Sequence, residues 1–478
     1  MSGALSAAAR ARPDALALDD GCGAWTYAEL DAAVGRMARR LAPLGATPGS
    51  TVALVAHPSA LSVQAVWAVP RSGAVLVPLN PRLGAASMER ALEVIGPDLI
   101  LSTEQDLHAA AIDPDWVTTL DDLPRPSVHS GAQDDVAVPD AGSQSPFALL
   151  WTSGTSGDPR AIPILSSALD ASARATVTRL NLAATDRWYA SLSLGHVGGL
   201  TLVHRAAHVG STLLVRGRFS VEALAELIGH ERVTHASLVP TMLKGLLDAS
   251  ESRSVPSTLR CLLIGGAAAG GTLIPRGIER GYPLALTYGL TEACSQVATA
   301  PPALVAKKPG TVGPPIDDLE VRIRQNGEIC VRGATISPGA ADEKGWLATG
   351  DVGRLDADGH LWVSGRISDR IVTGGVTVDP RSVEVVLEHL PGVSAAAVVG
   401  LPDDEWGETV VALVVAEAGV ITDSKVLSGH ARRRLSSSEL PRRIEFTDEL
   451  PTNANGKIDR GAVRAAFLSV PSTPDPMT

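Results

Sequence analysis

In its first part the chain alternates short apolar runs with segments of helical periodicity. Thr51–Ala56 and Ala74–Leu79 have the continuous apolar character of buried strands, and a helical stretch, Leu61–Val69, lies between them. A second helical segment, Ala85–Val94, leads to the apolar run Asp98–Leu101. Because parallel strands need long crossover connections, this alternation predicts a parallel sheet covered by helices.

The same alternation returns in the middle of the chain. Helical segments Val221–Glu231 and Thr241–Asp248 fall between candidate strands, which are Trp188–Leu192, Thr212–Val215, His235–Val239, Leu259–Ile264 and Leu284–Tyr288. Residues 121–146 separate the two regions and are rich in Asp, Ser, Pro and Gly, which is typical of a surface connection. The sequence therefore predicts two α/β units of similar size.

After residue 318 the pattern changes to short alternating strands. Leu319–Arg324 and Glu328–Arg332 flank Asn326-Gly327, a strong hairpin signal, and Asp358-Gly359 predicts a second hairpin. A shorter α+β pattern follows, with expected elements Arg370–Thr373, Arg381–Leu390, Ala395–Val399, Val410–Val415 and Ser424–Leu435. We therefore expect an α/β protein with a large N-terminal domain, residues 1–366, made of two α/β sheet units and a small β-barrel-like unit. A small, mobile α+β C-terminal domain, residues 367–478, completes the prediction.

Composition narrows the class of protein. The net charge of −11 and the 3% aromatic content argue against a nucleic-acid partner, which favours basic surfaces and aromatic platforms. The four cysteines lie far apart without a C-x-x-C pair, so small buried hydrophobes are favoured over a zinc site or a disulfide framework. The sequence shows no run of 18 apolar residues and no leader pattern, so we expect a cytoplasmic enzyme that is not in a membrane. The oligomeric state stays open, with a homodimer as one alternative.

A hydroxyl-rich loop follows the apolar run Phe147–Trp151. The predicted strand Phe147–Trp151 ends in a segment made only of Gly, Ser and Thr, namely Thr152, Ser153, Gly154, Thr155, Ser156 and Gly157. Glycines let backbone N–H groups converge on an anion and hydroxyls add donors, so this loop suits a phosphate. It is not a Walker loop, because no Gly-Lys-Ser/Thr follows. A flexible Gly/Ser linker is the alternative interpretation.

Small and polar residues also follow two strands of the second unit. Gly265, Gly266 and Ala267 come after Leu259–Ile264, at the carboxyl end of a parallel strand, where ligands bind in open α/β sheets. Tight strand–helix packing is the alternative there. The stretch after Leu284 supplies a ring, a hydroxyl and a carboxylate, which suit an adenine face, a phosphate oxygen and Mg²⁺; its members are Tyr288, Gly289, Thr291 and Glu292.

Three further polar positions lie later in the chain. Asp351, in Thr-Gly-Asp, offers a carboxylate to the two hydroxyls of a ribose, or merely caps a turn. Gly365–Arg370 lies where the fold pattern changes and is a hinge candidate. Lys457 lies in the turn-rich segment Pro451–Arg460, where charge alone makes it one more solvated lysine.

In this order and combination, the stretches resemble the adenylate-forming superfamily of acyl-CoA synthetases, adenylation domains and luciferases. The resemblance extends from Asp14 to Phe467. It implies a small-molecule carboxylic acid, ATP, Mg²⁺ and coenzyme A as reactants and cofactors. The acid attacks the α-phosphate of ATP to give an acyl-adenylate and pyrophosphate, and a thiol, usually that of CoA, then displaces AMP.

The resemblance also implies roles for single residues. Glu292 would carry Mg²⁺, Asp351 would bind the ribose, and Lys457 would bridge the carboxylate and α-phosphate oxygens. Ser368 would be the position about which the C-terminal domain swings. The remaining nucleotide contacts would come from the hydroxyl-rich loop and from Arg160, Gly265, Gly266, Ala267, Tyr288, Gly289, Thr291 and Arg366.

On the acyl side, Leu192–Leu200 matches the region that lines the substrate pocket of the family, with His196 at its tip. This region is similar to o-succinylbenzoate–CoA ligases, so His196 or Arg205 would meet a carboxylate or carbonyl of such an acid. Gly195 replaces the usual Phe, and a wider pocket for a bulky polycyclic acid is the alternative.

Two departures from the family pattern affect the chemistry. Arg160 follows Pro159 where a lysine is usual, and Val376–Pro380 replaces an acidic-Asn-Ile-Tyr-Pro run after the hinge. Arginine and lysine differ in geometry, so the phosphate contacts of Arg160 are open. A member that keeps only the thioester-forming half-reaction is therefore a further alternative, and so is a carrier-protein thiol in place of CoA.

Overall fold

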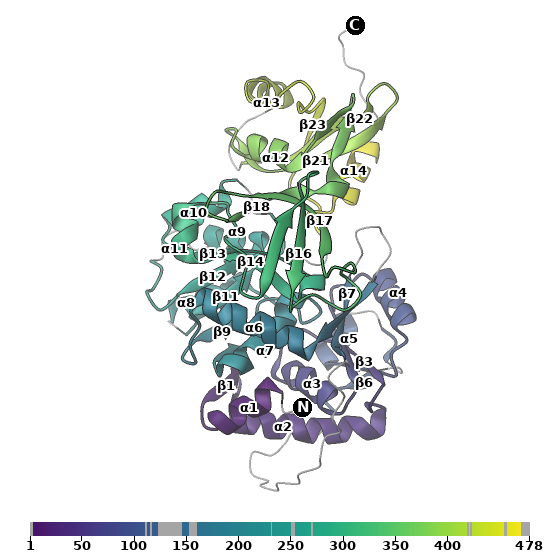
Figure 1. Ribbon diagram of the computed structural model, residues 1–478, viewed down its shortest axis with the longest axis vertical. Coiled ribbons are helices and arrows are strands. Elements are labelled where there is room, and N and C mark those ends of the chain that lie inside the picture. Colours follow the sequence, from purple (N-terminus) through teal and green to yellow (C-terminus); the bar gives the residue numbers. More distant parts are fainter. Residues whose placement is uncertain are drawn as a thin grey trace.

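The computed structural model of the protein describes residues 3–109, 112–114, 117–122, 146–152, 160–230, 232–249, 254–268, 271–417, 420, 423–453 and 457–469. Figure 1 shows a large N-terminal domain with a smaller C-terminal domain stacked on one end of it. None of the described helices combines the length and the apolar character needed to cross a membrane.

A six-stranded sheet forms one half of the N-terminal domain, in the order β6-β5-β3-β4-β7-β8. All neighbouring strands are parallel except the antiparallel pair β7–β8. Its strands are β3 (Thr51–Val55), β4 (Val75–Leu79), β5 (Leu99–Ser102), β6 (Val117–Thr119), β7 (Pro146–Thr152) and β8 (Arg160–Leu165). The first predicted α/β unit is confirmed, because these buried apolar runs pair through helical crossovers.

An eight-stranded sheet forms the other half, in the order β14-β13-β12-β11-β9-β10-β1-β2. Its strands are β1 (Leu16–Asp19), β2 (Ala24–Thr26), β9 (Arg187–Tyr189), β10 (Thr212–Leu214), β11 (His235–Leu238), β12 (Cys261–Ile264), β13 (Leu284–Leu290) and β14 (Ser295–Ala300). Only the two edge pairs, β1–β2 and β13–β14, are antiparallel. The predicted Trp188–Leu192 strand is shorter than expected, because the chain turns toward α7 after Tyr189.

Helices cover both sheets and fill the space between them. The central layer belongs to one apolar core with strands of both sheets and contains α1 (Ala4–Ala11), α2 (Tyr27–Leu41), α3 (Ala60–Arg71), α6 (Ser166–Leu180) and α7 (Val197–Val209). The outer faces are covered by α4 (Ala85–Ile95) and α5 (Glu104–Ala109) on one side, and on the other by α8 (Val221–Gly229), α9 (Pro240–Ala249), α10 (Leu273–Glu279) and α11 (Pro302–Lys307). Short 3-10 turns are η1 (Ala42–Leu44), η3 (Thr291–Ala293) and η4 (Ile367–Asp369).

A four-stranded antiparallel sheet follows, with the strands β15 (Leu319–Ile323), β16 (Glu328–Gly333), β17 (Leu347–Leu355) and β18 (Leu361–Arg366). The expected hairpin at Asn326-Gly327 is confirmed, and Gly327 has the left-handed φ of +84° that such a turn requires. The Asp358-Gly359 turn joins β17 and β18. This sheet packs its own apolar cluster against β14, and its last strand leads out of the N-terminal domain.

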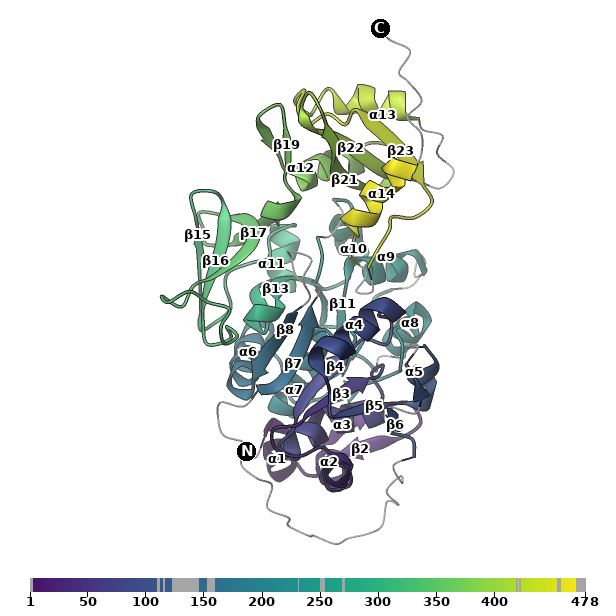
Figure 2. The ribbon, with the colours of Figure 1, turned by 90° about the vertical axis from the view of Figure 1, so that its right-hand side faces the viewer.

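The C-terminal domain has a five-stranded sheet with a separate apolar core. Its elements are β19 (Ile371–Thr373), β20 (Val376–Val378), α12 (Pro380–Glu388), β21 (Val393–Asp403), β22 (Gly407–Ala416), α13 (Ser424–Ala431), β23 (Arg443–Thr447) and α14 (Arg460–Ser469). In Figure 2, α14 lies on the side of this domain nearer the N-terminal domain. The predicted α+β character of this domain is confirmed.

Candidate active site

Two of the predicted ligand-binding stretches lie at the carboxyl ends of neighbouring strands in the eight-stranded sheet. Strands β11, β12 and β13 are parallel, so their carboxyl ends lie side by side, and the chain after β12 turns through Gly265 and Gly266. A Cβ on Gly265 would lie 2.6 Å from Cγ2 of Thr287 in β13, and Gly266 has φ +82°. Packing against the neighbouring strand therefore explains the glycine at 265, and Ala267 follows on the half-exposed rim.

The aromatic ring of Tyr288 is fixed by Asp351. The hydroxyl of Tyr288 donates to Oδ2 of Asp351 at 2.7 Å, across the gap between β13 and β17. Gly289 follows at an irregular step in the β13–β14 ladder. The hydroxyl contact fixes the orientation of the ring, which is partly buried against the apolar cluster of the antiparallel sheet.

Asp351 is the buried centre of the cluster. It is 6% exposed, and its Oδ1 forms an ion pair with Nε of Arg366 at 3.0 Å. Asp351 and Arg366 are direct partners in the β17–β18 ladder, so the last residue of the N-terminal sheet is paired with the candidate ribose ligand. Burial raises the pKa of Asp351, and Arg366, Tyr288 and Lys457 offset part of that rise.

The residues after β13 supply oxygen donors. Thr291 and Glu292 lie in η3, which contacts β8 of the other sheet. Within the described residues, the carboxylate of Glu292 has no ion-pair or hydrogen-bond partner; only its backbone carbonyl is used, by the N–H of Ser337 at 2.8 Å. A half-buried, unpaired carboxylate beside a hydroxyl is the set of hard oxygen donors that suits Mg²⁺.

Lys457 reaches this cluster from the C-terminal domain. Its turn is closed by the N–H of Asn453, which donates to the carbonyl of Lys457 at 2.8 Å, and by an antiparallel bridge between Thr452 and Ile458. Burial lowers the pKa of Lys457; Arg366 lowers it further, while Asp351 and Glu292 oppose the shift. The charges of Arg366, Asp351 and Glu292 act on Lys457 because β18, β17, η3 and the C-terminal turn lie close to one another.

His196 joins the same cluster and caps a helix. Its Nδ1 accepts a hydrogen bond from the N–H of Gly198 at 3.1 Å, at the start of α7. This bond assigns the proton of the neutral ring to Nε2. Burial lowers the pKa of His196 to about 4, and the positive charge of Lys457 adds to the effect. The ring is therefore a neutral donor at physiological pH.

Gly195 has a packing role in this structure. A Cβ at this position would lie 2.6 Å from the backbone nitrogen of Asn80 and 2.8 Å from the carbonyl carbon of Leu79, at the end of β4. The loop before α7 approaches β4 so closely that only glycine fits. The glycine therefore needs no wide acyl pocket to explain it, and the expectation of a pocket widened at residue 195 has no support here.

Arg205 does not lie with His196. It is nine residues farther along α7, about 13 Å by helix rise, and is 2% exposed. Its guanidinium carbon lies 5.1 Å from the ring centroid of Trp188, and burial lowers its pKa to about 10. No described residue hydrogen-bonds to its Nε. The structure thus places Arg205 in the core under the helix and away from the Lys457 cluster.

The hydroxyl-rich loop connects β7 to β8. Thr152 and Arg160 are partners at the end of that ladder, and the hydroxyl of Thr152 donates to the carbonyl of Arg160 at 3.3 Å. The side chain of Arg160 is exposed. Five expected phosphate-binding residues, Ser153, Gly154, Thr155, Ser156 and Gly157, lie outside the described residues. The strand that was predicted to precede the loop is confirmed.

A surface cavity of about 600 Å³ lies at the other end of the eight-stranded sheet. It is lined by residues at the amino-terminal ends of the strands, among them Arg187, Thr212 and Arg260. Ligands in open α/β sheets bind at the carboxyl ends, so this cavity is separate from the cluster around Asp351.

Two α/β sheets, an antiparallel sheet and a C-terminal domain that delivers a lysine to strand carboxyl ends define an adenylate-forming enzyme. The chain belongs to the AMP-binding enzyme family: the model of the AMP-binding enzyme matches residues 5–339, and that of its C-terminal domain matches residues 382–457. The expected membership in the adenylate-forming acyl-CoA synthetases, AMP-forming acid–thiol ligases, is confirmed.

Similar proteins carry related names. A feruloyl-CoA synthase of Amycolatopsis sp is 34% identical over 96% of this chain and 97% of its own length. A 2-succinylbenzoate–CoA ligase of Bacillus licheniformis is 33% identical over 95% of this chain and 98% of its own. Among solved structures, the o-succinylbenzoate CoA synthetase of Bacillus subtilis in complex with an acyl-adenylate intermediate has a TM-score of 0.85 at 30% identity, covering 99% of each chain. The predicted fold class is thereby confirmed.

Asp369 lies in the hinge candidate Gly365–Arg370 and Arg460 ends the segment Pro451–Arg460, but the sequence pattern indicated neither their ion pair nor the part that Glu384 takes in it. The available signal was the burial pattern of α12, in which Glu384 occupies an apolar position beside Val383 and Leu387. A carboxylate on the apolar face of a helix needs a buried partner, and the only way to find that partner is from the tertiary structure.

Proposed function

We propose that this protein is an ATP-dependent acyl-CoA synthetase for an aromatic carboxylic acid, with o-succinylbenzoate or a related acid as its substrate. The observation that carries the proposal is the convergence of Lys457 with Asp351, Glu292, Arg366 and His196. A cation delivered to an oxygen-rich nucleotide site is what adenylation needs, because the transition state gathers negative charge on the α-phosphate.

In the first half-reaction, a carboxylate oxygen of the acid attacks the α-phosphorus of ATP, and the bond to the β-phosphate breaks to release pyrophosphate. Asp351 accepts from the ribose hydroxyls, and Tyr288 supports the adenine ring. Lys457 neutralises charge on the reacting oxygens, and Thr291 and the loop around Thr152 contact the phosphates. Mg²⁺ held by Glu292 would supply further charge neutralisation at the phosphates.

In the second half-reaction, the CoA thiol attacks the carbonyl carbon of the acyl-adenylate, and the carbon–oxygen bond to AMP breaks. Lys457 has to leave for the thiol to enter, so the C-terminal domain turns about Ser368 in η4. We place the domain boundary at residues 366 and 367, directly after Arg366. In the present arrangement the hairpin of β19 and β20 exposes Val372 and Val376. This apolar face is available to contact the N-terminal domain in the arrangement for the second half-reaction.

Support for an aromatic acid comes from the similar proteins, since the acids in their names, ferulate and 2-succinylbenzoate, both carry a ring. His196, a neutral donor at the edge of the cluster, is suited to a carbonyl or carboxylate oxygen of the acyl group. A bulky polycyclic acid remains the second candidate for the substrate. Among the phosphate contacts, Arg160 alone motivates the half-reaction alternative.

A panel of acids tests the proposal. o-Succinylbenzoate, ferulate, benzoate, a fatty acid and a polycyclic acid are each assayed for pyrophosphate release and for acyl-CoA formation. We expect the highest kcat/KM for an aromatic acid in both assays. Acyl-CoA formation only from supplied acyl-adenylate would instead show that the protein keeps only the thioester-forming half-reaction. A preference for the polycyclic acid would show that the substrate is a bulky acid.

Three further proposals concern the cellular location of the protein, its macromolecular partners and its oligomeric state. We place the protein in the cytoplasm, where ATP and CoA are available, and expect no nucleic-acid partner because of its net charge of −11. We also propose that the protein forms a homodimer. Cell fractionation, a gel shift with duplex DNA and light scattering test these points one by one.

A further inference from the structure

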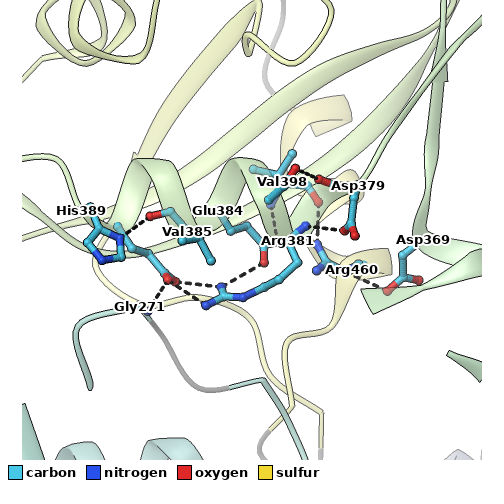
Figure 3. Close-up of polar contacts among 11 residues, drawn as sticks. Gly271, Asp369, Asp379, Arg381, Glu384, Val385, His389, Val398 and Arg460 are labelled. Atoms are coloured by element: carbon cyan, nitrogen blue, oxygen red, sulfur yellow. Dashed lines mark hydrogen bonds and ion pairs between the residues drawn. The ribbon is translucent and has the colours of Figure 1, made fainter. Parts of the chain in front are cut away.

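Arg460 follows Lys457 by three residues and contacts η4, α12 and β21 of the C-terminal domain (Figure 3). Its Nε donates to Oδ2 of Asp369 at 3.1 Å, and its Nη1 donates to Oε1 of Glu384 at 2.7 Å. Nη1 also donates to the backbone carbonyl of Val398 in β21. Asp369 belongs to η4, next to the proposed hinge residue Ser368, and Glu384 belongs to α12.

The ion pair between Arg460 and Glu384 is buried and has several further hydrogen bonds. Glu384 is 1% exposed and also accepts from the N–H of Val398 at 3.0 Å and from Arg381 at 3.3 Å. Burial lowers the pKa of Arg460, but Glu384 and Asp369 outweigh it, so that the pKa is raised and the charge is retained. A planar guanidinium can serve separate acceptors in fixed directions, which a lysine ammonium on a flexible stem cannot.

The backbone between Arg460 and Lys457 is also fixed. Ile458 packs against the apolar cluster of β21, β22 and α14. Asp459 caps α14, accepting from the N–H of Ala462 at 3.0 Å, and its own N–H donates to the carbonyl of Pro451 at 2.9 Å. Since Arg460 is the first residue of α14, its anchors set the direction in which the Lys457 turn leaves the C-terminal domain.

We infer that Arg460, through Asp369, is a positioning residue that aims Lys457 for adenylation, an inference that rests on the role proposed for Lys457. The Asp369 contact ties the turn to the segment about which the domain rotates. The same junction is closed on its other side, where the N–H of Gly271 in the N-terminal domain donates to Oε2 of Glu388 at 2.8 Å, and Glu388 pairs with Arg381 at 3.1 Å.

The test uses three variants of the full-length protein and separates the two half-reactions. Asp369→Asn removes one charge from a side chain that is 32% exposed, and Arg460→Lys keeps a partner for buried Glu384. Arg464→Gln is the matched control, because Arg464 lies one turn along α14 and donates to Gly400, away from the hinge. Pyrophosphate exchange reports adenylation, and thioester formation is measured from supplied acyl-adenylate.

For Asp369→Asn and Arg460→Lys we expect the kcat of adenylation to fall about tenfold, the scale of effect when reacting groups lose their alignment. The KM for ATP and the rate of thioester formation should each stay within about twofold of wild type. The Tm should stay within ~2 °C of the wild-type value. Arg464→Gln should match wild type in all assays.

Equal losses in both half-reactions, or a lowered Tm with proportional loss of all activity, would reduce Arg460 to a structural role and overturn the inference. Normal adenylation in both variants would do the same, provided that Lys457→Ala lowers the rate of adenylation by about 10²–10³-fold. If Lys457→Ala itself leaves adenylation intact, the proposed role of Lys457 fails first, and the positioning inference falls with it.

Discussion

At the scale of single residues, the charge of Lys457 is the most consequential feature of the site. Burial and Arg366 lower its pKa, and in the proposed mechanism the protonated form stabilises the adenylation transition state. Activity should therefore be present at low pH and be lost as pH rises through this lowered pKa, with an inflection below 10.5, the ordinary value for lysine.

The pH profile of pyrophosphate exchange checks this expectation. Lys457→Arg, whose side chain stays protonated, should move the alkaline limb to higher pH, and Lys457→Ala should reduce the rate by about 10²–10³-fold. Thioester formation from supplied acyl-adenylate should lack this limb. An unchanged alkaline limb in Lys457→Arg would show that another group titrates.

Glu292 gives a second prediction at this scale. Its carboxylate has no protein partner among the described residues, so its charge is available to a cation. Glu292→Gln should raise the Mg²⁺ concentration needed for half-maximal adenylation about tenfold or more, because a neutral amide does not balance the ion. Tm without Mg²⁺ should be unchanged. A wild-type Mg²⁺ dependence in Glu292→Gln would assign the carboxylate a structural role.

At the scale of elements, the loop before α7 depends on one close approach. A methyl group on residue 195 would lie 2.6 Å from the backbone nitrogen of Asn80, too close without backbone movement. We expect Gly195→Ala to destabilise the protein by about 1–3 kcal/mol, the usual range for overpacking. Urea denaturation measures this value. A neutral effect on stability combined with an altered ranking of acids would restore the pocket interpretation of residue 195.

The elements also show what a single sequence can predict. Buried strands such as Thr51–Val55 and Leu284–Leu290 contain apolar runs that the sequence predicts as strands. The structure places Gly265 directly after β12 and Tyr288 near the end of β13, and their role in binding a ligand stays a prediction. The short strand β1 pairs with β10 almost two hundred residues away, a contact that no local pattern encodes. The positions of Gly195 and Arg205 also depend on such distant neighbours.

At the scale of the whole molecule, the proposed mechanism requires two arrangements of the C-terminal domain, one for each half-reaction. In the arrangement seen here the charge of Lys457 acts on Asp351, and we propose that this is the pose for adenylation. Ser368→Pro would fix φ near −65° in η4 and limit rotation. We expect it to spare pyrophosphate exchange and to slow thioester formation about tenfold or more, as measured by single-turnover kinetics. Loss confined to adenylation would place the hinge elsewhere.

The central claim is that the acid attacks the α-phosphorus of ATP, and oxygen transfer tests it most directly. The preferred acid of the panel, labelled with ¹⁸O in its carboxylate, is converted to its CoA thioester, and the products are analysed by mass spectrometry. An acyl-adenylate requires one ¹⁸O atom to leave with AMP when the thiol attacks. Label recovered in inorganic phosphate, as an acyl phosphate would give, or absence of label from AMP would contradict the account.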